Sequence, residues 1–160
     1  MTVTSVTRTT DTRTMTFTAD FDAPVARVWN LWEDPHLLEQ WWGPPTYPAT
    51  FDVHDFRPGG RSNYHMTGPE GDTPRGWWRA LSVDPPKRFE FENGFAGPDG
   101  EPDPTMPFMV VRVSFEEVDE GTTRMISEIE YPSTEAMEKF LSMGMEEGMT
   151  LAMGQMDALL

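Results

Sequence analysis

Histidines are the side chains of this sequence best suited to acid–base or metal chemistry, and there are three: His36, His54 and His65. No pair has the i, i+4 or His-x-His spacing of a zinc site, and no HExxH motif occurs. His54 and His65 fall on neighbouring expected strands, where they could meet in a shared metal or catalytic site. Ordinary strand residues with exposed or hydrogen-bonded rings are the simpler interpretation. The sequence therefore predicts no metal site and identifies no catalytic residue.

Other catalytic signatures are missing as well. The chain has no cysteine, which excludes disulfide bonds, thiolate zinc ligands and a cysteine nucleophile. Neither a G-x-S-x-G nucleophile motif nor a phosphate-binding G-K-[ST] loop occurs. The acidic stretches "PEGD" (69–72) and "GPDGEPDP" (97–104) lack the residue spacing of a calcium-binding loop. We expect these charges to be solvated, and no cofactor is expected.

Aromatic and methionine side chains point instead to the binding of an apolar molecule. The sequence contains six tryptophans and twelve methionines. Methionine adapts to irregular apolar shapes, and tryptophan offers a large flat face with one N–H donor. Plain core packing is the competing interpretation for each of these side chains. The residues expected to line a cavity are Trp32, Trp41, Trp42, Tyr64, Met66, Trp77, Phe89, Phe91, Phe115, Leu141, Met145, Met149 and Ala152.

Two short helices are expected after the first strand. Residues 14–21 alternate apolar and polar side chains, which predicts a strand with one buried face. The next residues change to a helical period, with Asp22 as the candidate N-cap and Asp34 separating a second helix from the first. Gly43 is expected to end this second helix in the left-handed conformation, because the two prolines that follow prevent its continuation.

The two tryptophans at the end of the second helix are expected to have different roles. A helix of two turns is too short to be stable by itself. One ring of Trp41 and Trp42 should therefore pack against Leu38 and the first helix as an anchor. Helical spacing places the two side chains about 100° apart, so the other ring should border the mouth of the cavity.

The remaining chain is expected to form strands followed by one helix. The proline-rich stretch 95–107 should be a long loop, either a lid or an insertion. Residues 133–160 should form a single long helix capped by Ser133 or Thr134. Its three glycines predict a kink or a close approach of the backbone to the sheet or a ligand. The strands after the first are expected near 47–57, 61–67, 75–84, 87–94, 108–118 and 122–131.

This order predicts an α+β helix-grip fold. A curved antiparallel sheet of about six to seven strands should be crossed by the long C-terminal helix, with a cavity between them. Residues 14–160 should form this single domain, and residues 1–13, which lack the apolar core of a signal peptide, should be flexible. Strand alternation lets only one of Trp77 and Trp78 face the cavity, so the other should lie outside or at a subunit contact. The polar candidates for the cavity are Tyr64, His65, Arg79, Arg112 and Glu128.

Four stretches carry a family resemblance: "FDAPVARVWNLWEDPHLLEQWWGP" (21–44), "DFRPGGR" (55–61), "VDPPKRFEF" (83–91) and "MGMEEGMTLAMGQMDALL" (143–160). Together they resemble the activator-of-heat-shock-ATPase-like branch of the START/Bet v 1-like (SRPBCC) superfamily. The resemblance implies a helix-grip fold with a hydrophobic ligand cavity. Similar members include cochaperone domains, polyketide cyclases and antibiotic-resistance proteins, so the resemblance implies function only loosely.

The leading hypothesis is a cytoplasmic protein, monomeric or homodimeric, that binds or sequesters a small hydrophobic molecule such as a lipid or an aromatic polyketide-like compound. A cyclase- or hydrolase-like enzyme with acid–base groups in the cavity is one alternative, and a chaperone ATPase modulator or protein-interaction module is another. The net charge of −15 disfavours nucleic acids and anionic membranes as partners. No apolar run approaches the ~20 residues of a membrane-spanning helix, so membrane insertion is not expected.

Overall fold

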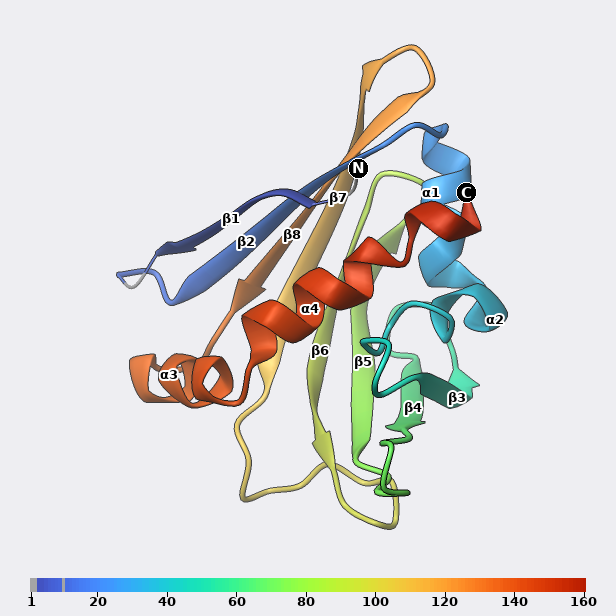
Figure 1. Ribbon diagram of the computed structural model, residues 1–160. Helices are drawn as coiled ribbons and strands as arrows, with labels where there is room; N and C mark the ends of the chain where they lie inside the picture. Colours follow the sequence, from blue (N-terminus) through green and yellow to red (C-terminus); the bar gives the residue numbers. More distant parts are fainter. Residues whose placement is uncertain (1–2, 10) are drawn as a thin grey trace.

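A computed structural model describes residues 3–9 and 11–160 and shows one antiparallel sheet curved around a C-terminal helix (Figure 1). The strand order is β1-β2-β8-β7-β6-β5-β4-β3. The strands are β1 (Val3–Thr9), β2 (Thr14–Phe21), β3 (Ala49–His54), β4 (Arg61–Met66), β5 (Arg75–Asp84), β6 (Arg88–Ala96), β7 (Met109–Asp119) and β8 (Thr122–Glu130). The helices are α1 (Val25–Glu33), α2 (Pro35–Leu38), α3 (Thr134–Ser142), α4 (Met145–Gly154) and the 3-10 turn η1 (Asp157–Leu159).

The alternating sequence of the strands produces the buried face of the sheet. In β2, Met15, Phe17 and Ala19 are fully buried while the residues between them are partly exposed. The neighbouring β8 repeats this alternation and pairs with β2 along its full length. The buried faces of both strands belong to a single hydrophobic core. The expected α+β architecture, with an antiparallel curved sheet and a C-terminal helix, is therefore confirmed.

The sheet has eight strands rather than six to seven because β1 adds to its edge. Residues 1–13 were expected to be flexible, but Val3–Thr9 pairs antiparallel with β2, and Val6 lies opposite Phe17. Valine and threonine favour extended backbone, and β2 offers them an open edge. Residues 1, 2 and 10 of that segment lie outside the described residues.

The C-terminal segment is two helices, which corrects the expectation of one helix over 133–160. Ser133 caps α3 by accepting a hydrogen bond from the backbone N–H of Ala136, at 3.0 Å. Gly144 then has a φ of 82°, a left-handed conformation that ends one helical direction and starts another. As a result, α3 lies at one end of the sheet while α4 crosses its concave face (Figure 1).

Two expected helix signals also differ in the structure. Asp22 is not the N-cap of α1, because α1 begins after Pro24 without a side-chain cap. Asp34 instead caps α2 through the backbone N–H of His36, at 2.9 Å. Gly43 does not have the positive φ expected of it. A glycine is needed there because an added Cβ would overlap the carbonyl oxygen of Tyr47.

Aromatic rings fill the core between α1, α2 and the sheet. The Trp32 ring centroid lies 4.6 Å from that of Trp41 and 5.0 Å from that of Phe89, both in edge contacts. Trp41 is fully buried, and its indole N–H donates to the carbonyl oxygen of Leu31 at 2.9 Å. Trp41 thereby ties the segment after α2 to the end of α1.

Replacing Trp41 should therefore remove a large part of the stability of the fold. Trp41→Ala leaves a cavity and an unpaired Leu31 carbonyl, so we expect the free energy of unfolding to fall by about 3–5 kcal/mol in urea denaturation. Leu151→Ala is the control, because Leu151 is 57% exposed on α4 and should change stability by about 0.5 kcal/mol or less. Equal losses in the two variants would contradict the anchoring role.

Candidate functional site

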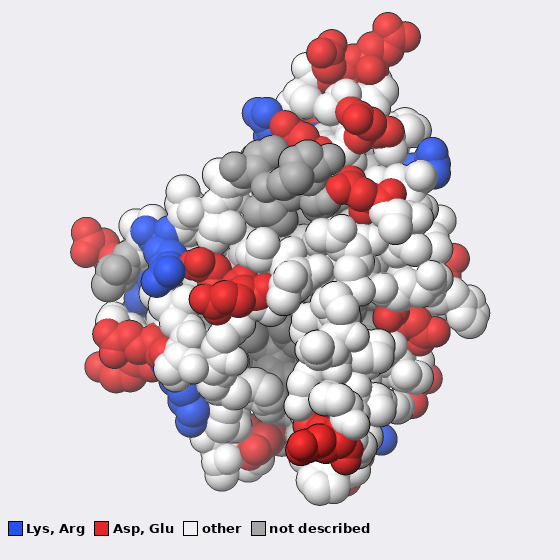
Figure 2. Space-filling model, viewed as in Figure 1, with Lys and Arg blue, Asp and Glu red and all other residues white. Residues whose placement is uncertain are grey.

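A cavity of about 270 Å³ lies between the concave face of the sheet and the two C-terminal helices. Figure 2 shows this face hollowed just below α4, with uncharged atoms around the opening and acidic side chains farther out. The lining is almost entirely apolar. It consists of Trp42, Pro44, Tyr64, Met66, Asn93, Phe95, Met109, Phe140, Met143, Met145, Gly148 and Met149.

The local sequence pattern explains why these residues converge. Tyr64 and Met66 stand two apart on β4, so they share the inner face of the strand. On α4, Met145, Gly148 and Met149 are spaced i, i+3 and i+4 and therefore form one face of the helix. The cavity is the space that these two faces enclose without filling.

Five of the expected cavity residues line this space: Trp42, Tyr64, Met66, Met145 and Met149. Another group is buried or packs against the hydrophobic core and does not line the cavity. This group consists of Trp32, Trp41, Phe89, Phe91, Phe115, Leu141 and Ala152. The tryptophan pair is thus divided, with Trp41 in the core and Trp42 at the boundary between core and cavity.

Trp77 is on the wrong face of the sheet for the cavity role expected of it. Trp78, its neighbour, points inward, with its ring centroid 4.1 Å from that of Phe91. Strand alternation then turns Trp77 outward, where Phe108 packs on it with ring centroids 5.7 Å apart. Trp77 is only 8% exposed. Phe108, at the end of the connection between β6 and β7, therefore covers the outer face here, and none of residues 97–108 lines the cavity.

The cavity-lining residues on β6, β7 and α3 were not among those predicted from the sequence. Asn93 and Phe95 continue the inner-face alternation of Phe89 and Phe91 on β6, so the period of two was the available signal. Met109 extends the alternation of β7 in the same way. The full set missed is Pro44, Asn93, Phe95, Met109, Phe140, Met143 and Gly148.

The polar groups of the cavity wall form one small cluster. The side-chain amide nitrogen of Asn93 lies 3.1 Å from the Tyr64 hydroxyl and 3.0 Å from the Trp77 carbonyl oxygen. Burial raises the pKa of the Tyr64 hydroxyl, and the nearby N–H groups of Asn93 and Trp42 oppose this only in part. Tyr64 is therefore protonated at neutral pH. The buried indole N–H of Trp42 lies near the Tyr64 hydroxyl, although the two do not form a well-aligned hydrogen bond.

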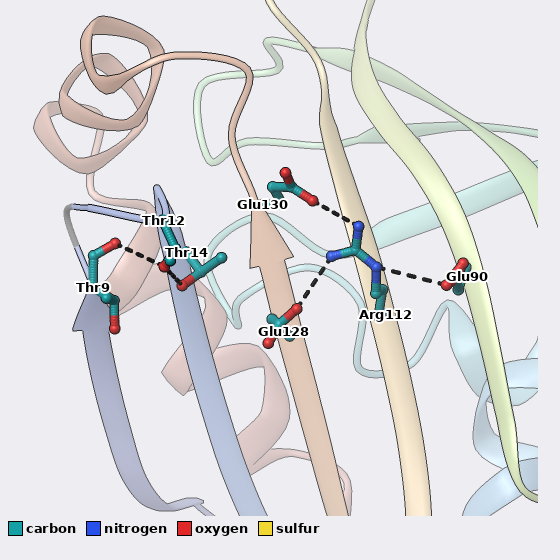
Figure 3. A network of polar contacts seen from close by, with 7 residues as sticks. All are labelled: Thr9, Thr12, Thr14, Glu90, Arg112, Glu128 and Glu130. Atoms are coloured by element: carbon teal, nitrogen blue, oxygen red, sulfur yellow. Dashed lines mark hydrogen bonds and ion pairs between the residues drawn. The ribbon is translucent and has the colours of Figure 1, made fainter.

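The other polar candidates lie on the opposite face of the sheet. His65 and Arg79 alternate with inward residues of β4 and β5. Figure 3 shows Arg112 on the sheet between carboxylates of the two neighbouring strands. Its guanidinium nitrogens lie 3.6 Å from Glu90, 3.1 Å from Glu128 and 2.6 Å from Glu130. These carboxylates raise the pKa of Arg112, and the cluster plays no part in the cavity.

The histidines do not combine into a site. The ring nitrogen Nε2 of His54 lies 2.8 Å from the Trp32 carbonyl oxygen, and Nδ1 lies 2.8 Å from the Ser62 hydroxyl. A carbonyl oxygen only accepts, so Nε2 carries the proton and Nδ1 accepts from Ser62. His65 points to the other face of the sheet, near Asp52. Residues 3–9 and 11–160 contain no group of three or more side chains arranged to hold a metal ion.

The sheet, the crossing helix and the cavity between them are consistent with a helix-grip protein. The family model for Activator of Hsp90 ATPase homolog 1-like protein matches residues 22–160, and the chain belongs to this family, as its sequence resemblance implied. A search among curated proteins gave no match. None of the helices in the described ranges is long and apolar enough to cross a membrane.

Solved structures of several bacterial proteins are similar to nearly the whole chain. A solution structure from Arthrobacter aurescens is 45% identical, with a TM-score of 0.95 and coverage of 99% of this chain and 91% of that one. A crystal structure from Mycobacterium smegmatis is 46% identical, with a TM-score of 0.90 and coverage of 99% and 96%. A solution NMR structure from Staphylococcus epidermidis is 29% identical, with a TM-score of 0.85 and coverage of 98% and 93%.

The buried environment of His54 has a consequence for stability. Burial lowers its pKa, while the Trp32 carbonyl and the charges of Asp55, Asp34 and Glu33 oppose the shift. The folded protein therefore takes up a proton on His54 less readily than the unfolded chain, whose histidine has a pKa of about 6.5. Below that pH the unfolded state binds more protons, so stability falls as the pH is lowered.

We expect His54→Gln to flatten this loss of stability. The free energy of unfolding of the unmodified protein should fall between about pH 7.5 and pH 5, and the variant should fall less steeply, as measured by urea denaturation at each pH. His36→Gln is the control, because the His36 side chain is 88% exposed and should leave the slope unchanged. Parallel curves for His54→Gln and the unmodified protein would contradict the assignment.

Proposed function

We propose that the protein binds a small, uncharged hydrophobic molecule in the cavity beneath α4. The observation that carries the proposal is the cavity itself, about 270 Å³ in volume and lined mainly by methionine and aromatic side chains. Ligand sites for small molecules are typically about 300–1,000 Å³, so this one matches a compact ligand. Methionine side chains can repack around different apolar shapes at low cost.

The charges around the cavity favour an uncharged ligand. The residues that line it include no lysine, arginine, aspartate, glutamate or histidine. An ion placed there would lose its hydration without gaining a charged partner, which is strongly unfavourable. The protein also carries a net charge of −15, which repels anions on approach.

The ligand would enter the cavity at the junction between α3 and α4. Met143 lines the cavity and is also 54% exposed, so it stands at the boundary between the cavity and solvent. Gly144 beside it has the left-handed conformation that turns one helix into the next. The unbranched Met143 side chain can therefore swing over the opening or away from it without moving the backbone.

The alternatives drawn from the sequence have no comparable support. An acid–base enzyme needs a titratable group within reach of a bound substrate, and the cavity lining offers only the Tyr64 hydroxyl, which burial keeps protonated. A chaperone-related role has only the family description behind it, and a shared fold is a weak basis for function.

Gly148 offers a direct way to fill the cavity. Gly148 lines the cavity, and a Cβ added to it would meet no atom within 4 Å. Gly154 lies on the same helix, is exposed and has equal room for a Cβ, but it does not line the cavity. Both substitutions would remove the glycine penalty of up to about 1 kcal/mol from α4, so Gly154 is a matched control.

We expect Gly148→Phe to abolish ligand binding and Gly154→Phe to preserve it. The measurement is the thermal stability of each variant with a panel of neutral one- and two-ring aromatic compounds and medium-chain aliphatic alcohols and ketones. A compound that binds the cavity at 100 times its Kd should stabilise the unmodified protein by about 2.7 kcal/mol. If no compound stabilises the unmodified protein, or if Gly148→Phe responds equally, the proposal is wrong.

A further inference from the structure

We infer that the bound molecule carries a neutral hydrogen-bond acceptor, such as a ketone, aldehyde, ester or amide carbonyl oxygen, which the Tyr64 hydroxyl holds at the inner wall. The inference rests on the proposed function and narrows it to one ligand class, an apolar molecule with a single carbonyl end. It follows from the hydrogen bonds of the cavity wall, which leave the Tyr64 hydroxyl hydrogen without an acceptor.

The orientation of the Asn93 amide determines where the Tyr64 hydroxyl hydrogen can point. The Trp77 carbonyl, 3.0 Å away, can only accept, so the atom of Asn93 that faces it must be the NH₂ nitrogen. The same nitrogen lies 3.1 Å from the Tyr64 hydroxyl. The Tyr64 oxygen therefore accepts from Asn93, and its own hydrogen must point elsewhere. No hydrogen bond among the described residues gives that hydrogen an acceptor.

Trp42 lies beside the same hydroxyl. Its buried indole N–H is near the Tyr64 oxygen, to which it can only donate, and Trp42 is only 4% exposed. Its ring meets that of Tyr64 edge-on, with centroids 5.9 Å apart. Buried donors without acceptors are uncommon because they lose hydration without compensation. An acceptor atom on a ligand at this wall would provide that compensation.

Gly76 explains how the hydroxyl is held in place. Gly76 lies opposite Tyr64 in the pairing of β4 with β5. An added Cβ on Gly76 would overlap the Tyr64 ring and its hydroxyl oxygen, so the ring lies directly against the strand. The hydroxyl is therefore positioned from one side by the Gly76 backbone and from another by Asn93, which is the preorganisation that a specific donor needs.

The absence of a cationic side chain from the lining favours a ligand with a neutral carbonyl group over a ligand with a carboxylate. A carboxylate ligand needs a compensating positive charge when it is removed from water, and the lining residues provide none. A neutral carbonyl needs only the Tyr64 hydroxyl donor at the wall. The apolar remainder of such a ligand would then lie against the methionines of α4.

The test compares two neutral probes of closely similar shape, 2-acetylnaphthalene and 2-isopropenylnaphthalene, by titration of tryptophan fluorescence. We expect the unmodified protein to bind the ketone about tenfold more tightly than the hydrocarbon. Tyr64→Phe should reduce this ratio to about one while still binding both probes. Tyr47→Phe is the control, because the Tyr47 hydroxyl is exposed and donates to Asp72 at 2.8 Å, away from the cavity.

The infrared stretching frequency of the bound ketone's carbonyl group reports the hydrogen bond directly. A change in the shape of the cavity alone would not alter this frequency. It should lie at a lower frequency in the unmodified protein than in Tyr64→Phe. Equal affinity for the two probes, blocked by Gly148→Phe, would overturn this inference and leave the cavity proposal standing. A preference for the ketone that survives Tyr64→Phe would also overturn it. Failure to bind either probe would contradict both the inference and the proposed function.

Discussion

The edge-on packing of Trp32 between the first helices and the sheet is the interaction on which the rest of the structure depends. Its ring lies 4.6 Å from Trp41 and 6.0 Å from Trp42 by centroids, and 5.0 Å from Phe89 on β6. These contacts fill the concave face at one end of the sheet with rigid rings. They also fix Trp42 at the border of the filled region, where its other face becomes a wall of the cavity.

The cavity is not filled because the side chains that cover it differ from the aromatic rings of the core. α4 brings methionines and Gly148 over the sheet instead of further rings, and α3 contributes Phe140, which stacks on Phe95 at 5.7 Å. The far end of α4 is held by Gln155, whose side chain donates to the Gly43 carbonyl at 2.7 Å. A rigid wall therefore faces an adaptable cover. This combination suits an apolar ligand whose polar end is recognised specifically and whose remainder is accommodated by shape.

Local patterns were sufficient to predict the buried face of β2, the helix that ends at Asp34, and a cap at Ser133 or Thr134, because each depends on neighbouring residues alone. The strand at Val3–Thr9 was missed because its stability comes from pairing with β2. The sequence around Gly144 is compatible with a glycine inside one helix and with a break between two helices. Only the packing of α3 and α4 against the sheet decides between these possibilities. Which of Trp77 and Trp78 points inward depends on how β5 is placed in the sheet. Because the two residues are identical and adjacent, their side-chain types give no indication of which one is buried in the core. Asn93, Phe95 and Met109 of the cavity lining were missed for a related reason, since each requires its strand to be placed on the correct face.

The most direct measurement of the central claim is a methyl NMR titration of the protein with its methionine methyl groups labelled, using 2-acetylnaphthalene as the ligand. The methionines divide naturally into two groups, because five line the cavity while Met15 and Met125 are fully buried in the core. The account predicts that the methyl signals of Met66, Met109, Met143, Met145 and Met149 shift together and saturate at one equivalent. Shifts spread evenly over the core methionines, or no shift at any of these five, would contradict it.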